Sequence, residues 1–131
     1  MQEDHLRPPA PEPRGVPSTV ALAADLMFAG RIRGTAHSTG RQVLLARSPA
    51  EVTDAVRAGA RRVLIDLDAR SHDPIALIRA LREDPTTNDA AIIAWASHVR
   101  ADAIAQARAA GADRVLARSA FVRELSSLLA E

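Results

Sequence analysis

The sequence contains no cysteine, no tyrosine and no lysine, and its aromatic residues are two phenylalanines and one tryptophan. Without cysteine, the chain cannot form disulfides, thiolate metal sites or cysteine nucleophiles. All seventeen basic residues are arginine, so Schiff-base chemistry and lysine contacts to phosphate are excluded as well. With so few aromatic rings, there is no platform on which nucleic-acid bases could stack.

A strong net charge and a long apolar run are also absent. The formal net charge is +1 at pH 7, which gives no electrostatic support for binding to nucleic acid or to an acidic membrane. No apolar run approaches the ~20 residues that span a bilayer. The N-terminus also lacks the basic segment followed by an apolar segment that is typical of a secretory signal. Of the 131 residues, 47% are hydrophobic and 25% charged, as in one globular domain, which we expect to be cytoplasmic.

Proline is concentrated at the beginning of the chain. Residues 1–17 contain five of the eight prolines and almost no large apolar side chains. Such a composition cannot bury enough apolar surface to fold, so we expect a disordered or extended tail. Residues 18–131 are then expected to form the folded domain.

After the tail, short apolar runs alternate with amphipathic segments. Strands are expected at residues 19–23, 42–46, 62–67, 90–96 and 114–117. Helices are expected at residues 25–37, 48–59, 73–84 and 100–110, and from Ser119 (as the N-cap) onward. The clearest helix signal is SPAEVTDAVRAGA, in which Ser48 is the N-cap, Pro49 the first helical residue and Gly59 the stop.

This alternation predicts an α/β fold. Strands that are apolar on both faces and separated by helices indicate a parallel sheet covered on each side. We therefore expect a three-layer sandwich with a five-stranded parallel sheet, of the flavodoxin-like kind with strand order 2-1-3-4-5. Ligands of such sheets bind beyond the C-terminal strand ends, where Asp25, Asp66, Ala96, Ser97 and Arg118 are expected.

Three segments carry a resemblance to a known family. They are VLID, which ends at Asp66, AIIAWASH at the end of the fourth strand, and GADRVLARSAF near the C-terminus. The sequence resembles the response-regulator receiver domain, the CheY-like phosphoacceptor module of two-component signalling. The resemblance covers about residues 19–130, and the intervals between Asp66, Ala96 and Arg118 are like those between the family's conserved positions.

The resemblance implies a phosphorylation site built from five side chains. In the family, two acids after the first strand and the phosphoacceptor aspartate hold Mg²⁺, a hydroxyl binds the phosphoryl group, and a lysine pairs with it. Here Asp66 falls on the phosphoacceptor position, and Ala24 with Asp25 falls on the acid pair. Asp25 and Asp66 are thus the candidate Mg²⁺ ligands, and no other cofactor is expected. Because Mg²⁺ takes oxygen ligands, the missing carboxylate weakens such a site.

The other two positions of the implied site have also changed. Ala96 falls on the hydroxyl position and cannot bind a phosphoryl oxygen. Ser97 could substitute only if the strand has already ended there, since neighbouring strand residues point to opposite faces. Arg118 falls on the lysine position, where it keeps the charge as a planar guanidinium. In the family, an aromatic side chain commonly moves together with the hydroxyl as the switch. Its position falls on Val115, which cannot report phosphorylation in that way.

These changes favour a degenerate receiver, or pseudo-receiver. We expect a stand-alone, non-enzymatic signalling module that acts by protein–protein contact, through residues 100–130, the face that receivers use. One alternative is a working receiver that accepts phosphate on Asp66 with Mg²⁺, and another is a small-molecule-binding domain. The resemblance implies signalling partners, among them a histidine kinase or phosphotransfer protein. Asp66 is either the phosphoacceptor or a strand-end carboxylate neutralised by Arg118.

Several other side chains have simple structural interpretations. Asp68 is expected to be a solvated loop acid, and Arg79 and Arg82 to lie on a solvated face. Trp95 is expected in the core or at the sheet edge, whereas an exposed position would make it an anchor for a partner. His98 invites a metal or phosphohistidine role, but the four histidines lack the spacing of a helical metal site, so no such role is expected.

Overall fold

The computed structural model describes residues 17–97 and 100–130. Its five strands form one parallel sheet in the order β2-β1-β3-β4-β5, as the sequence pattern predicts. The expected tail lies outside the described residues except for Pro17, and so does His98. None of the helices in the described ranges is long and apolar enough to cross a membrane.

The helices and strands alternate along the chain, and most boundaries fall within a residue or two of those expected. The strands are β1 (Thr19–Leu22), β2 (Val43–Leu45), β3 (Arg62–Asp66), β4 (Ala91–Ala96) and β5 (Arg114–Ala117). The helices are α2 (Leu26–Ser38), α3 (Pro49–Arg57), α4 (Pro74–Glu83), α5 (Ala101–Ala110) and α6 (Arg118–Ala130).

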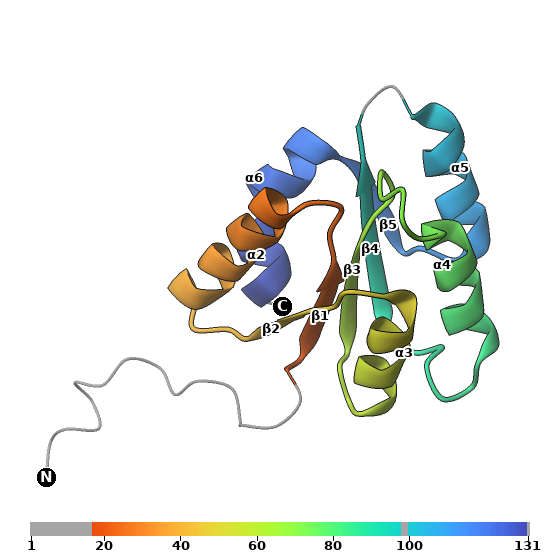
Figure 1. The fold of residues 1–131 in the computed structure, drawn as a ribbon, viewed down its shortest axis with the longest axis horizontal. Helices are drawn as coiled ribbons and strands as arrows, with labels where there is room; N and C mark the ends of the chain where they lie inside the picture. Colours follow the sequence, from red (N-terminus) through yellow and green to blue (C-terminus); the bar gives the residue numbers. More distant parts are fainter. Residues whose placement is uncertain (1–16, 98–99, 131) are drawn as a thin grey trace, which may run out of the picture.

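Each face of the sheet is covered by its own group of helices. Figure 1 shows α3, α4 and α5 on one side and α2 and α6 on the other. Two clusters of buried side chains fill the spaces between them, one with Val63 and Ile65 of β3 and one with Leu64 of the same strand. This alternation follows from the two-residue period of a strand, and both faces of β3 are apolar because it lies in the middle of the sheet.

Side-chain caps explain where three of the helices begin. The carboxylate of Asp25 accepts a hydrogen bond from the backbone N–H of Phe28, and Asp73 caps α4 in the same way. Ser48 caps α3 as predicted, with Pro49 in the first turn. The prediction that Ser119 caps the last helix is wrong. Because β5 passes into α6 without an intervening loop, Ser119 lies inside the helix.

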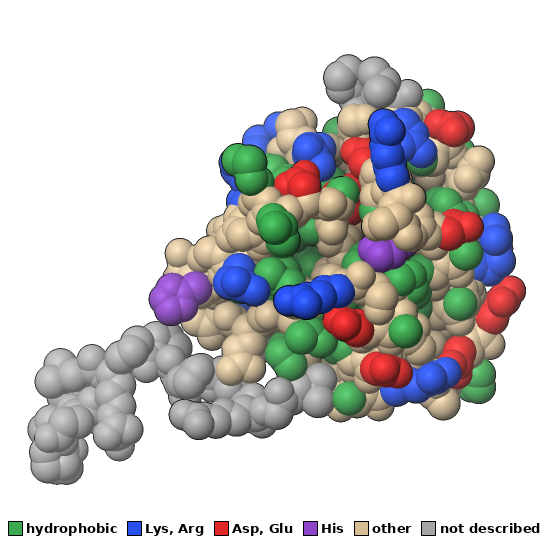
Figure 2. All heavy atoms as spheres, viewed as in Figure 1, with side chains coloured by type: hydrophobic (Ala, Val, Ile, Leu, Met, Phe, Trp, Pro, Cys, Tyr) green, Lys and Arg blue, Asp and Glu red, His purple; other side chains and the backbone are tan. Residues whose placement is uncertain are grey.

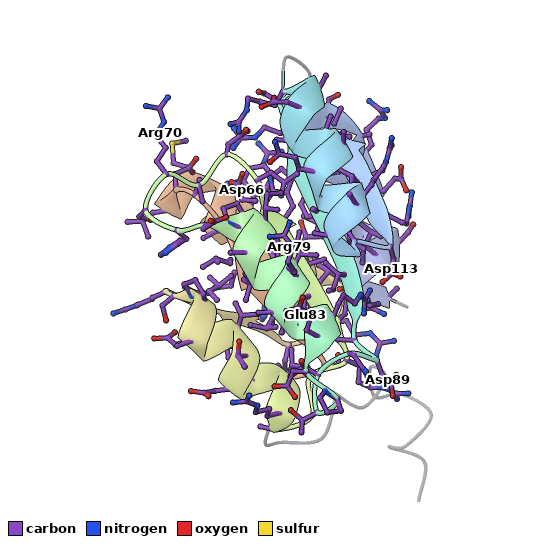
Figure 3. All side chains as sticks on the ribbon, turned by 90° about the vertical axis from the view of Figure 1, so that its right-hand side faces the viewer. Asp66, Arg70, Arg79, Glu83, Asp89 and Asp113 are labelled. Carbon is purple, nitrogen blue, oxygen red and sulfur yellow. The ribbon has the colours of Figure 1, made fainter. Side chains whose placement is uncertain are left out.

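Arg82 lies in a network of hydrogen bonds, so the expectation that it is solvated is also wrong. Its guanidinium donates to the carbonyl oxygens of Asn88, Ala90 and Gly111 at 2.7–2.8 Å and to Asp113 Oδ2 at 2.7 Å. These bonds join α4 to the loops before β4 and β5. Other side chains of α4 behave as expected, since Arg79 and Glu83 are exposed on its outer face (Figure 3).

Candidate functional site

Four of the predicted positions come together at the C-terminal edge of the sheet. Asp66 is the last residue of β3, and Asp25 follows β1 as the cap of α2. Ala96 ends β4, and Arg118 follows β5 as the first residue of α6. Because parallel strands end at the same edge, residues from four separate parts of the chain meet there.

Asp66 is fully buried, and backbone donors occupy both of its carboxylate oxygens. Oδ2 accepts a hydrogen bond from the N–H of Ala24, and Oδ1 accepts one from the N–H of Asp68, each at 2.9 Å. Burial raises the pKa of Asp66 above its ordinary value, although the two N–H groups and the charge of Arg118 oppose this rise. Figure 3 shows Asp66 enclosed, whereas Arg70 of the following loop projects away from the protein.

Arg118 lies over the buried carboxylate without a hydrogen bond to it. Its Nη2 atom is 3.6 Å from Asp66 Oδ2 and 4.0 Å from Asp25 Oδ2, and its guanidinium carbon is 4.7 Å from the centre of the Phe28 ring. The side chain is 41% exposed, and within the described ranges its Nε is buried and has no hydrogen-bond partner. Charge and the face of Phe28 therefore hold the guanidinium in place.

A stack of three aromatic rings lies beneath Arg118. Trp95 is fully buried, with its ring centre 4.0 Å from that of Phe121 and 5.2 Å from that of Phe28. The expectation of a core position for Trp95 is confirmed. In the sheet, Trp95 is the register partner of Asp66. A displacement of Arg118 or of the β3 end should therefore alter the fluorescence of this tryptophan.

Asp68 connects two loops, so the interpretation as a solvated acid is wrong. Its side chain is 22% exposed. Oδ2 accepts a hydrogen bond from the N–H of Ser97 at 3.0 Å, and Oδ1 accepts one from Arg100 at 3.4 Å. The one sequence signal for Asp68 is its position two residues after Asp66, at the same strand end. The sequence pattern does not indicate the loop that it binds.

Ser97 lies just beyond the end of β4, as a hydroxyl substitute for Ala96 would require. It is half-buried, and its main chain is hydrogen-bonded to Asp68. Ala96 is fully buried and brings no hydroxyl to the site. The substitution of a Ser97 hydroxyl for the missing one remains a prediction.

Replacing Asp68 by alanine should free the segment that follows β4. We expect a loss of about 1–2 kcal/mol in the free energy of unfolding and faster hydrogen exchange at the Ser97 amide, because its N–H loses a charged acceptor. Thermal unfolding and exchange measured by NMR would check this. The control is Asp102→Ala, because Asp102 is 73% exposed and its contact with Arg100 is long, at 3.9 Å. Equal effects of Asp68→Ala and Asp102→Ala would contradict the role of Asp68 in holding the segment that follows β4.

The arrangement does not fit a Mg²⁺ ion. One oxygen of Asp25 accepts the capping hydrogen bond, both oxygens of Asp66 accept backbone bonds, and the guanidinium of Arg118 lies beside both carboxylates. Over residues 17–97 and 100–130, no group of three or more His, Cys, Asp or Glu side chains could hold a metal ion. Mg²⁺ requires near-octahedral oxygen coordination, for which two engaged carboxylates are a poor donor set.

Comparison with known proteins finds similarity in structure but not in sequence. No protein-family profile and no curated protein sequence matches the chain. The signal receiver domain of a DNA-binding response regulator from Colwellia psychrerythraea superposes with a TM-score of 0.71 and 16% identity, over 86% of this chain and 98% of that one. The phosphorylated response regulator of a cyanobacterial phytochrome gives 0.68 and 19%, over 86% and 88%.

A third similar structure contains a phosphorylated aspartic acid. A response regulator from Burkholderia pseudomallei, solved with a phosphorylated aspartic acid, a calcium ion and citrate, has a TM-score of 0.70 and 23% identity, over 85% of this chain and 65% of that one. The strand order and the helices of the present chain agree with these structures. The chain therefore has the CheY-like receiver fold of response regulators.

Proposed function

We propose that this protein is a receiver-like signalling module that acts by protein–protein contact and does not depend on phosphorylation. The proposal rests on the environment of the Asp66 carboxylate. This residue is fully buried, its two oxygens accept hydrogen bonds from Ala24 and Asp68, and its nearest cation is Arg118. The carboxylate at the phosphoacceptor position is thus part of the internal structure.

The chemistry of phosphoryl transfer supports this proposal. The attacking carboxylate needs an accessible oxygen, and the transferred group needs cations and hydrogen-bond donors around it. Attack by Asp66 would require Arg118 to move, because the carboxylate is fully buried and Arg118 lies over it. Burial also raises the pKa of Asp66 and so favours its protonated, less nucleophilic form. Neither Ala24 nor Ala96 can replace the missing carboxylate and hydroxyl.

The contact of Asp68 with Ser97 supports the same proposal. In the receiver family, the hydroxyl after the fourth strand binds the phosphoryl group and moves in response to it. Here Ala96 occupies that position, and the following segment is held by the Asp68 carboxylate at 3.0 Å from the Ser97 nitrogen. A carboxylate that belongs to the protein can hold this segment in one arrangement at all times. Partner binding would then need no phosphoryl signal.

One observation favours a working phosphoacceptor as the second candidate. The Arg118 side chain is 41% exposed, and its buried Nε has no hydrogen-bond partner among the described residues. It could therefore swing outward and open a path to Asp66, leaving Asp25 and Asp66 facing the space that it vacated. In this candidate Arg118 would pair with the phosphoryl group in place of a lysine.

Incubation with a phosphodonor distinguishes the two candidates. With Mg²⁺ and acetyl phosphate, or Mg²⁺ and beryllofluoride, we expect no change in intact mass and no change in Trp95 fluorescence. A mass increase or fluorescence change that disappears in Asp66→Ala would contradict the proposal and favour the phosphoacceptor.

A restored site provides the positive control. The triple variant Ala24→Asp, Ala96→Thr and Arg118→Lys supplies the second acid, the hydroxyl and the ammonium that the resemblance implies. We expect this variant to gain the Asp66-dependent response that the natural chain lacks. If the restored site responds and the natural one does not, the substitutions explain the loss. If neither the triple variant nor the natural chain responds, the enclosure of Asp66, and not the substitutions, explains the lack of phosphorylation.

A further inference from the structure

Two large apolar side chains in the first turn of α2 are almost fully exposed. Leu26 is 90% exposed and Met27 is 89% exposed. Over the described part of the chain, the other exposed large hydrophobic residue is Leu44, at 38%. Single exposed apolar residues are common and need no explanation, but here two adjacent ones lie beside a hollow. The buried stripe of α2 begins only at Phe28, so the helix does not need this pair for its own packing.

The pair lies at the rim of an open hollow beside the buried carboxylate. Figure 2 shows hydrophobic side chains next to acidic and basic ones at the N-terminal end of α2. The hollow measures about 510 Å³ and is lined by Asp25, Leu26, Met27, Phe28, Arg31 and Arg118. It thus combines apolar walls with charged groups that can give orientation to a bound segment.

The charges of the hollow favour an acidic partner. Arg31 is exposed in it, and the Arg118 side chain is 41% exposed, with a buried Nε that has no hydrogen-bond partner among the described residues. The single carboxylate in the lining, Asp25, already accepts the N–H of Phe28. The other nearby carboxylate, Asp66, is fully buried behind Arg118. The guanidinium of Arg31, together with the solvent-facing part of Arg118 that its contacts with Asp66 and Asp25 leave open, can therefore receive a carboxylate from outside.

The face expected from the family is a weaker candidate. None of the described residues of α5, β5 or α6 is an exposed large hydrophobic. One pair of charged side chains there, Arg114 and Glu124, forms an ion pair at 2.8 Å. Interfaces depend on a few buried apolar or aromatic anchors more than on exposed ion pairs at their rim. The α2 end of the sheet provides such anchors.

We propose that this hollow is the docking site for a segment of a partner protein that carries a large apolar side chain within one helical turn of an aspartate or glutamate. The apolar side chain would pack on Leu26 and Met27, and the carboxylate would bind Arg31 and Arg118. A helix that inserts one apolar face into a groove makes contacts of this kind. This inference rests on the proposed function, because it names the surface and the chemistry of the partner through which the module acts.

Selection from a random peptide library tests the docking site directly. The full chain is immobilised without Mg²⁺ or phosphodonor, and a displayed library of 16-residue peptides is selected on it. We expect enrichment of peptides that place Leu, Ile, Met or Phe within four residues of Asp or Glu. The double variant Leu26→Ser, Met27→Ser and the single variants Arg31→Gln and Arg118→Gln should each weaken binding of the enriched peptides at least tenfold.

Two matched variants control for general effects on the surface. Leu44→Ser removes the third exposed hydrophobic residue, and Arg33→Gln removes an exposed arginine of α2 that does not line the hollow. Both should bind the enriched peptides like the natural chain, and thermal unfolding should show that every variant is folded.

The proposal is overturned if no peptide is enriched, if the enriched peptides are basic, or if their binding survives the double variant. It is also overturned if sedimentation shows a dimer that the double variant abolishes, since a second copy would then cover the hollow. The two experiments test separate points. Failure of peptide binding would refute the docking site without changing the phosphodonor result. A mass increase from phosphorylation of Asp66 would refute the proposed function without changing the peptide-binding result.

Discussion

Replacing Arg82 by alanine is expected to lower the free energy of unfolding by about 3 kcal/mol, because it removes four hydrogen bonds from one charged side chain. The carbonyl oxygens of Asn88, Ala90 and Gly111 would each lose a donor. Asp113 would lose its ion pair while its Oδ2 still accepts the N–H of Ile92. For a domain of this size, such a loss corresponds to a melting temperature lower by about 10 °C.

Chemical denaturation with urea, followed by circular dichroism, measures this effect. The matched control is Arg79→Ala on the same helix, where the side chain is exposed on the outer face (Figure 3). We expect that variant to change the free energy of unfolding by less than about 0.5 kcal/mol. Similar losses in the two variants would mean that helix propensity, and not the network of Arg82, is responsible.

Replacing Arg118 by glutamine is expected to destabilise the protein at neutral pH by about 2 kcal/mol. The guanidinium is the cation closest to the fully buried Asp66, at 3.6 Å. Its removal leaves a buried negative charge with only backbone donors, a situation that costs several kcal/mol when the site is dry. The exposure of Arg118, at 41%, lets water replace part of its effect, so we expect a value below that range.

The destabilisation should depend on pH in a definite direction. Burial already raises the folded pKa of Asp66 above the ordinary value of 3.8, and the loss of Arg118 raises it further. A carboxyl with a raised folded pKa favours the folded state at low pH, and this contribution is lost as the pH rises through the folded pKa. The difference in stability between Arg118→Gln and the natural chain should therefore be largest at pH 7 and shrink toward pH 4.

Urea unfolding at several pH values, together with a double-mutant cycle, checks this prediction. In an Asp66→Ala background the buried charge is absent, so Arg118→Gln should cost little and show no pH dependence. The control Arg123→Gln removes an exposed arginine of the same helix and should have little effect at any pH. A pH-independent loss in Arg118→Gln would mean that packing on Phe28, and not the charge of Asp66, explains its role.

The sequence alone was enough to predict the architecture. Apolar runs such as that of β3 are buried on both faces, and the capping signals at Ser48 and Asp73 mark where helices begin. Such signals are local in the chain, so they can be read without knowing what packs against them. The alternation of strand and helix then permits few topologies, and the observed sheet order is the one predicted. The same regularity brought Asp25, Asp66 and Arg118 to one edge of the sheet.

Only the tertiary structure showed what these residues contact. Asp68 binds the main chain of a residue 29 positions away, and Arg82 binds Asp113 across 31 positions. Because such contacts depend on how two loops or helices meet, no local pattern encodes them, and both residues were expected to be solvated. The exposure of Leu26 and Met27 was equally hidden, since an apolar residue near a helix start looks the same in sequence whether it packs inward or faces water. Periodicity and capping thus determined the fold and the position of Asp66, while packing between distant segments decided that its oxygens are engaged and which surface remains open to a partner.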